Sequence, residues 1–224
     1  MIDTKIIDLL IYSLPLLLKG LWITLQVGIL GTFIGIVGGL IFGILNSKKL
    51  KLKYVSWVIN FYVLIIRGTP LYVQVLIFYF ALPDLLDINL SPFVAGILAL
   101  GFNSIAYVSE IIRSGINSIP EGQWDAAYVL GYGFFGTMKF IILPQMLKNV
   151  LPALTSELVT LIKDTSILSA IGLVEMTRLG NNINARLLQP MPIYLSVAFL
   201  YLIITTTISA ISKKIEKRLS YGHR

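Results

Sequence analysis

The chain has 224 residues, of which 56% are hydrophobic and only 13% are charged. Soluble domains average about 45–50% apolar and about 25% charged residues, so the composition excludes an ordinary soluble enzyme and indicates a membrane protein with several spans. There is no cysteine, and the single histidine is His223. These counts exclude disulfides, thiolate metal sites and histidine-based catalysis. The net charge of +7 fits basic loops on one side of a membrane better than nucleic-acid binding.

The apolar runs, taken in chain order, predict an all-α polytopic membrane protein with a single domain over 1–224. A bilayer core requires about 20 apolar residues per helix. We expect five spanning helices, over about 14–45, 54–82, 90–112, 145–171 and 189–212. Arg67 interrupts the second helix, and the fourth is weakly hydrophobic because it carries Glu157, Lys163 and Asp164. The N-terminal segment has acidic residues and a long apolar run, so it is interpreted as a span and not as a cleaved signal peptide.

Basic residues predict the orientation, because cytoplasmic loops are enriched in lysine and arginine. One side of the predicted topology holds twelve of the eighteen basic residues: Lys48, Lys49, Lys51, Lys53, Arg113, Lys139, Lys148, Lys213, Lys214, Lys217, Arg218 and Arg224. The other side holds four: Lys5, Lys19, Arg178 and Arg186. The bias predicts an N-terminus outside and a C-terminus in the cytoplasm.

The cytoplasmic excursion over about 113–145 contains a predicted short helix at 118–131. Ser118 and Glu121 have capping-box spacing, and Pro120 suits a first helical turn. Gly131 suits the left-handed position after the helix end. The helix either docks another protein through the small surface of Ala126 and Ala127 or rests on lipid headgroups. The apolar stretch 126–143 is broken by glycines and is predicted to be a loop followed by a helix, not a span.

Several ordered motifs resemble those of the permeases of binding-protein-dependent ABC transporters, in the branch that carries polar amino acids. The loop motif of that family is matched by Asp125, Ala126, Ala127, Gly131, Ile141, Leu143 and Pro144. Further similar segments are Arg67-Gly68-Thr69-Pro70-Leu71 with Gln74, Glu110 to Arg113, Ser118 to Gln123, and Lys163-Asp164-Thr165-Ser166. Asp125 stands where the family usually has glutamate, so the carboxylate is kept on a shorter stem.

The resemblance implies the type I ABC importer permease fold, with five helices and a short cytoplasmic coupling helix. It implies a multi-pass subunit of the bacterial cytoplasmic membrane that imports polar amino acids. Coupling would use Asp125, Ala126, Ala127, Gly131, Glu121 and Pro144. The implied partners are an ATP-binding cassette ATPase dimer, a second permease subunit, identical or related, and an extracytoplasmic amino acid-binding protein.

No Walker-type phosphate-binding sequence occurs in the chain, so we expect no enzymatic activity and no cofactor here, with ATP bound by the partner ATPase. Two alternative classes are less consistent with the sequence. A gradient-driven transporter or channel could also use acidic residues in spans, but five spans without an internal repeat disfavour it. An intramembrane enzyme is disfavoured because the sequence has neither His-Glu-x-x-His nor Gly-x-Ser-x-Gly.

Polar residues inside the predicted spans are candidates for a substrate pathway. Glu157 and Asp164 are seven residues apart, so they point the same way with a rise of roughly 10 Å, and Thr160 lies between them. A helix this polar must be sheltered or face a water-filled path. For Asp164 the alternative is fixing of the helix end together with Lys163. Two carboxylates at that separation would suit a substrate with two positive centres, such as a basic amino acid.

The third predicted helix carries Asn103, Tyr107 and Glu110 on one face. Glu110 and Arg113 are expected to form a structural pair, whereas Asn103 and Tyr107 could line a path. Arg67 could attract a substrate carboxylate. It could equally satisfy carbonyls freed where Gly-Thr-Pro breaks the helix, which is the commoner role of an arginine at such a break.

Overall fold

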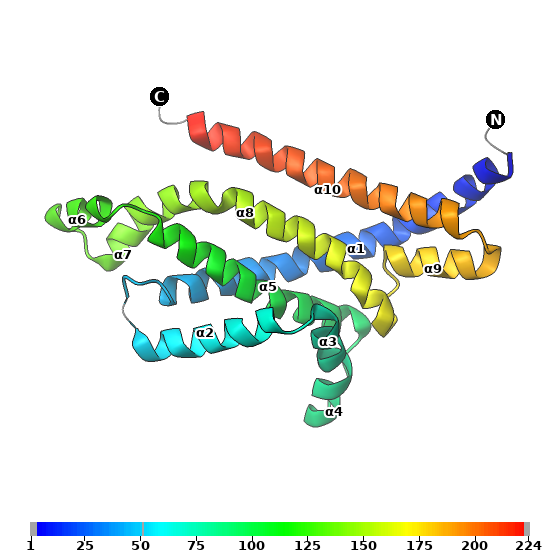
Figure 1. The fold of residues 1–224 in the computed structure, drawn as a ribbon, viewed down its shortest axis with the longest axis horizontal. Helices are drawn as coiled ribbons and strands as arrows, with labels where there is room; N and C mark the ends of the chain where they lie inside the picture. Colours follow the sequence, from blue (N-terminus) through cyan, green and yellow to red (C-terminus); the bar gives the residue numbers. More distant parts are fainter. Residues whose placement is uncertain (1–3, 51, 222–224) are drawn as a thin grey trace.

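The computed structural model describes residues 4–50 and 52–221, which are almost entirely helical. Four long helices follow the long axis of the molecule: α1 (Thr4–Leu45), α5 (Pro92–Asn117), α8 (Leu143–Asp164) and α10 (Pro190–Tyr221). The shorter α2 (Lys53–Gly68) lies beside α5, and α9 (Met176–Leu187) precedes α10 (Figure 1). Within the described residues, Ile11–Leu45, Pro92–Asn117 and Pro190–Arg218 are long and apolar enough to cross a membrane.

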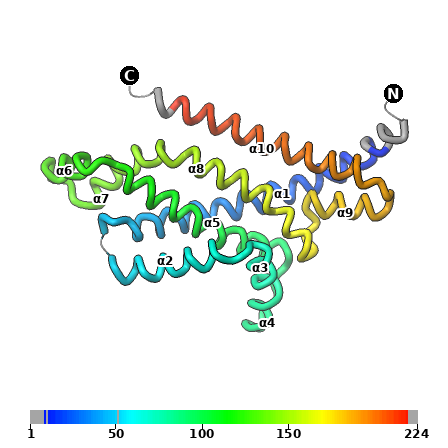
Figure 2. The backbone as a smooth tube through the Cα atoms, in the orientation of Figure 1, coloured from blue at the N-terminus to red at the C-terminus, as the bar shows by residue number. Residues whose placement is uncertain are grey.

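The predicted second span is not one helix. α2 ends at Gly68, and the chain continues as α3 (Leu71–Leu76), the π-helical turn η1 (Ile77–Ala81) and α4 (Leu82–Leu86). The two halves are bent by 103°, so α3 and α4 project sideways from the bundle (Figures 1 and 2). Thr69 is extended, at φ −119° and ψ 147°, because the ring of a following proline disfavours helical geometry. The predicted break at Gly68-Thr69-Pro70 is therefore confirmed, whereas the size of the bend was not predicted.

The bounds of the third and fourth predicted helices also differ from the prediction. α5 continues to Asn117, and helix resumes at Phe134 as α7 (Phe134–Thr137) and the π-helical turn η2 (Met138–Ile142), which lead directly into α8. The segment between the end of α5 and the start of α7 is therefore residues 118–133. Beyond α8, residues Thr165–Ile171 form a 3₁₀ helix, η3. Each π-helical turn ends two residues before a proline, Pro83 or Pro144, whose missing N–H and bulky ring disturb the regular ladder.

Helices α1 and α5 pack closely through glycines of α1. A Cβ placed on Gly39 would lie 2.5 Å from the side chain of Val108, and one on Gly43 would lie 2.6 Å from that of Ile112. Inside a bilayer the hydrophobic effect does not drive helices together, so close van der Waals contact between small residues does. Glycine at these positions lets the two helices approach to a distance that alanine would prevent.

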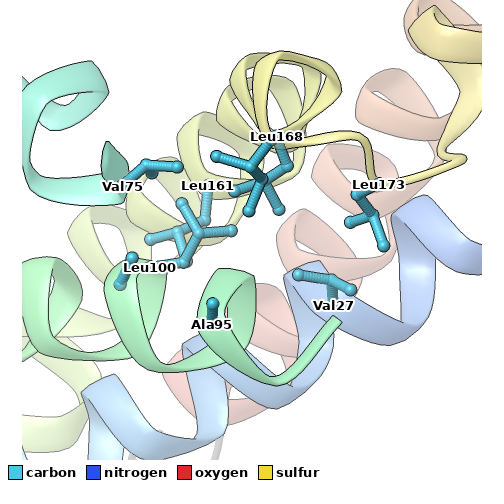
Figure 3. Close-up of a cluster of buried hydrophobic side chains, with 9 residues drawn as sticks. Val27, Val75, Ala95, Leu100, Leu161, Leu168 and Leu173 are labelled. Carbon is cyan, nitrogen blue, oxygen red and sulfur yellow. The ribbon is translucent and has the colours of Figure 1, made fainter. Parts of the chain in front are cut away.

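A cluster of buried side chains joins α1, α3, α5, α8 and η3. The cluster, drawn in Figure 3, consists of Val27, Val75, Ala95, Ala99, Leu100, Leu161, Leu168, Ile171 and, from the segment after η3, Leu173. Val75 comes from the bent segment, so the cluster attaches α3 to the bundle. A second cluster, which includes Ile116, Trp124, Ile142 and Met146, fills the opposite end beneath α6 (Glu121–Val129).

The basic segments of the chain lie together at one end of the bundle. The end of α1, the start of α2, the end of α5, α6, the start of α8 and the end of α10 all lie there (Figure 1). The N-terminus, α9 and the start of α10 lie at the other end. This arrangement agrees with the segregation of basic residues that predicted the topology. Lys51 and Arg224 lie outside the described residues.

Candidate functional site

Glu157 of α8 lies between helices, near the middle of the bundle. The Ser104 hydroxyl of α5 donates a 3.0 Å hydrogen bond to Glu157 Oε1. Ser104 is fully buried, and it sits opposite Gly35, where a Cβ would lie 2.2 Å from the serine Oγ. Glu157 and Asp164 are both partly buried on α8, whereas Arg67 of α2 is exposed.

Gln74 of α3, and not Arg67, satisfies the carbonyls at the helix break. Its side-chain amide donates to the carbonyl oxygens of Ile66 at 2.7 Å and Thr69 at 3.2 Å, and to the Thr69 hydroxyl at 2.9 Å. Its own oxygen accepts a 2.9 Å hydrogen bond from the Asn103 side chain. Gln74 and Asn103 are both buried. The carbonyl-capping role considered for Arg67 thus belongs to Gln74, which leaves the guanidinium available for other contacts.

Arg67 instead lies against a polar cleft between α2, α5 and α8. Its guanidinium carbon is 5.1 Å from the centre of the Tyr107 ring, a cation–π distance. The cleft has a volume of about 760 Å³ and is lined by Arg67, Tyr107, Glu110, Ile111, Arg113, Ser114, Gly115, Ser118, Asn149, Val150 and Ala153. An adjoining hollow of about 590 Å³ shares Arg67, Tyr107, Glu110 and Arg113 with it. The cleft runs from the helix break towards the basic end of the bundle.

The predicted pair of Glu110 and Arg113 is confirmed. The Arg113 guanidinium donates from Nε at 3.0 Å and from Nη2 at 2.6 Å to the two carboxylate oxygens. This two-point geometry holds both side chains in a fixed orientation. Tyr107 lines the cleft, whereas Asn103 is buried against Gln74, and neither Glu157 nor Asp164 is among the residues that line it. Thr160 and Lys163 are exposed on α8.

The predicted short helix exists as α6 (Glu121–Val129), and its end has the expected geometry. Gly131 has φ +82°. The Tyr132 amide donates to the Ala127 carbonyl and the Gly131 amide donates to the Tyr128 carbonyl, each at 3.0 Å, which is the Schellman arrangement. The predicted capping box is wrong. The Ser118 hydroxyl donates to the Gly115 carbonyl, and α6 has no side-chain cap at its start.

The two alanines of the loop motif have opposite environments. Ala127 is fully buried beside Trp124, whereas Asp125 and Ala126 are exposed. The expectation that Ala127 belongs to an exposed docking surface is therefore wrong. Large apolar side chains of the same loop are exposed instead: Val129 at 88%, Leu130 at 73% and Phe135 at 87%. Pro144 is exposed and lines a groove of about 770 Å³ together with Pro120, Gln123 and Lys148.

A buried carboxylate at the other end of the bundle was missed by the sequence reasoning. Glu175 precedes α9 and accepts hydrogen bonds from the backbone N–H groups of Thr177 at 2.8 Å and Arg178 at 2.6 Å. The Tyr201 hydroxyl of α10 donates to it at 3.2 Å. These contacts make Glu175 an N-terminal cap that ties α9 to α10. An acidic residue just ahead of a helical segment was the available signal.

The fold and this site define a class of protein: a polytopic helical membrane protein with a broken helix and a charged cleft, features found in transport proteins. Residues 31–221 match the family described as "Binding-protein-dependent transport system inner membrane component". The chain belongs to this family.

Relatives and a solved structure agree with that membership. The chain is 37% identical over 207 residues to the arginine transport system permease protein ArtQ of Bacillus subtilis, covering 92% of this chain and 94% of the relative. It is 37% identical over 212 residues to the glutamine transport system permease protein GlnP of Escherichia coli, covering 92% and 94%. A crystal structure of an amino acid ABC transporter with histidines superposes with a TM-score of 0.84 at 36% identity, covering 93% of this chain and 96% of that chain.

Proposed function

We propose that this chain is the permease of an ATP-driven importer of polar amino acids, with basic amino acids as its preferred substrates. The observations that carry the proposal are the polar cleft lined by Arg67, Tyr107 and Glu110 and the partly buried Glu157 carboxylate that Ser104 holds between α5 and α8. An amino acid needs an anion for its ammonium group and a cation for its carboxylate. Glu157 supplies the first and Arg67 the second. Asp164, roughly 10 Å from Glu157 along α8, would take a second positive centre.

The names of related proteins support this substrate class. Relatives of similar identity include permeases named for arginine, glutamine and L-cystine transport, all polar amino acids. Family membership also favours an ATP-driven importer over the gradient-driven alternative. In this proposal, substrate specificity is shared between this chain and an extracytoplasmic binding protein.

A second permease subunit is proposed because this chain leaves a charged cleft uncovered. The charged cleft opens beside α2 and α8, and charged groups facing lipid are costly. A second permease subunit, identical or related, would cover it and complete the pathway. In this arrangement α8 also spans the membrane, sheltered by α5, α1 and α10, which explains its polarity. The end with α6 and the basic segments would face the cytoplasm, with the N-terminus outside.

ATP would be hydrolysed by a partner ATPase that docks on the loop around α6. Asp125, Ala126 and the exposed apolar side chains Val129, Leu130 and Phe135 offer the contact surface. Exposed aromatic and aliphatic side chains at this density are characteristic of protein interfaces. Glu121 is exposed at the start of α6, and Pro144 lines the groove beside Pro120 and Gln123.

The test of the substrate pathway is Glu157→Gln in the complete importer, reconstituted in liposomes with its ATPase and binding protein. The amide keeps the shape but removes the charge. A lost charge-assisted contact of about 1.5–3 kcal/mol would lower the uptake of arginine or lysine roughly 10- to 150-fold. Uptake of neutral polar amino acids would fall as well, because Glu157 is proposed to bind the ammonium group that every amino acid carries, and a loss confined to basic amino acids is expected of Asp164→Asn. Glu216→Gln, on the last turns of α10, is the matched control. Wild-type uptake of basic amino acids by the Glu157→Gln variant would contradict the proposed pathway.

The test of ATPase docking is Gly131→Val against Gly133→Val. Gly131 has a positive φ, whereas Gly133 has an ordinary φ of −74°, and a Cβ added at either position would have open space within 4 Å. A side chain in the left-handed region costs about 1–2 kcal/mol, so only the first change should distort the end of α6. We expect reduced co-purification with the ATPase, or reduced uptake per ATP, for Gly131→Val alone. Equal coupling in both variants would exclude this loop as the docking site.

A further inference from the structure

A single lysine connects α6 to the loop between α1 and α2. Lys49 Nζ lies 2.7 Å from Glu121 Oε1 and 5.2 Å from the centre of the Trp124 ring. Glu121 and Trp124 are three residues apart, so they share one face of α6. The Lys49 side chain is only 24% exposed. One side chain of the loop therefore contacts two points on the predicted docking helix.

The loop that carries Lys49 is itself anchored to α2. Asn46 and Ser47 are buried, and the Asn46 side-chain amide donates a 2.7 Å hydrogen bond to Asn60 Oδ1 of α2. α2 ends at the helix break beside Arg67. Contacts thus run continuously from α6 through Lys49 and Asn46 to the helix that presents Arg67 to the cleft.

We infer that Lys49 is a positioning residue that holds α6 against the α1–α2 loop, so that a movement of α6 is transmitted to α2 and to Arg67. The covalent connections of α6 lead only to α5 and to the segment before α8. The Lys49 contact adds a third connection, to a helix that lines the other side of the cleft. The inference rests on the proposed function in one respect, namely that α6 is the element moved by the ATPase.

The expected loss of transport on removing the Lys49 charge is small, because its partner Glu121 is largely exposed to solvent. Glu121 is 80% exposed, and ion pairs in contact with water contribute little. The aromatic contact adds to this because Trp124 is buried. We therefore expect about a two- to fivefold loss of transport per ATP when the lysine charge is removed, and no loss of assembly.

The experiment compares Lys49→Met with Lys48→Met in the reconstituted complex. Methionine keeps an unbranched apolar stem over Trp124 and removes the charge, and the neighbouring Lys48 is exposed. Uptake per ATP should fall for Lys49→Met and Glu121→Gln only, and the charge swap of Lys49→Glu with Glu121→Lys should restore part of it. Equal coupling in the two lysine variants, or a swap no better than the worse single change, would overturn the inference. So would detachment of the ATPase by Lys49→Met alone, since that indicates direct contact with the partner.

A second measurement separates this inference from the proposed function. The chain has no cysteine, so spin labels at Lys48→Cys and Asp125→Cys report the distance between the loop and α6 without background. Adding Lys49→Met should broaden that distance distribution, whether or not the protein transports amino acids. An unchanged distribution would show that Lys49 does not position α6, and transport by the wild-type protein would remain a separate question.

Discussion

The two faces of α5 have opposite properties. Towards α1 the contact is so close that a Cβ on Gly43 would lie 2.6 Å from Ile112. The other face carries Tyr107, Glu110 and Ser114, which line an open, charged cleft. The comparison shows how one helix can serve both stability and transport. Small residues on its neighbour make one face rigid through van der Waals contact, and that rigid contact holds the polar face in place without filling the cleft.

The largest effect on stability is expected where α1 packs against α5, at Gly35 of α1. Gly35→Ala places a Cβ 2.2 Å from the Ser104 Oγ and 2.5 Å from its Cβ, and the second contact cannot be relieved by rotating the hydroxyl. We expect a loss of about 3 kcal/mol of stability, at the upper end of overpacking costs. Displacing Ser104 should also disturb Glu157 and lower uptake. The measurement is the thermal unfolding midpoint in detergent, together with uptake.

Gly122→Ala is the matched control, because Gly122 is a helical glycine of α6 with nothing within 4 Å of its Cβ position. Alanine there should be neutral or stabilising by up to about 1 kcal/mol. The two identical changes should therefore have opposite signs. If Gly35→Ala is as stable as Gly122→Ala, α1 and α5 are not in the described close contact.

An intermediate effect is expected at Gln74, which joins the buried side of α5 to the helix break. Gln74→Met keeps the approximate volume but removes the donors to Ile66 and Thr69 and the acceptor for Asn103. Each buried polar group left unsatisfied costs about 1–3 kcal/mol. Partial relaxation of the break should keep the total near 2 kcal/mol, with a larger loss of uptake than of stability.

Gln123→Met serves as the reference for Gln74→Met. Gln123 is an exposed glutamine of α6 that accepts a hydrogen bond from Gln145, so its loss should barely change the unfolding midpoint. Similar midpoints for the two glutamine variants would mean that the break is held by its backbone alone.

The smallest effect on stability is expected on the face of α5 that lines the charged cleft. Glu110→Gln weakens the pair with Arg113, whose side chains are 23% and 33% exposed. Because water reaches both groups, the loss should stay below about 1 kcal/mol. The unfolding midpoint, measured beside that of Gly35→Ala, checks this ranking. A loss as large as that of Gly35→Ala would show that the cleft is closed to water and that the two faces of α5 are more alike than described.

Local features of the sequence predicted the helix break and the turn at Gly131 because their causes are local. A proline restrains the residue before it, and a left-handed residue after a helix favours glycine. The i, i+3 pairing of Glu110 with Arg113 could be predicted for the same reason. The break was located correctly, but its 103° bend was not, since the angle depends on the packing of Val75 and Gln74 against α5.

The sequence by itself determined that this is a polytopic helical membrane protein of the binding-protein-dependent transport family, because composition, hydrophobic length and ordered motifs are properties of the chain. Only the tertiary structure decided which side chains share an environment. It buried Ala127 and left Ala126 exposed, assigned the carbonyls of the break to Gln74, and brought Arg67 to Tyr107 in the cleft. Such contacts depend on the rotation and approach of helices distant in the sequence, which no local pattern of residues specifies.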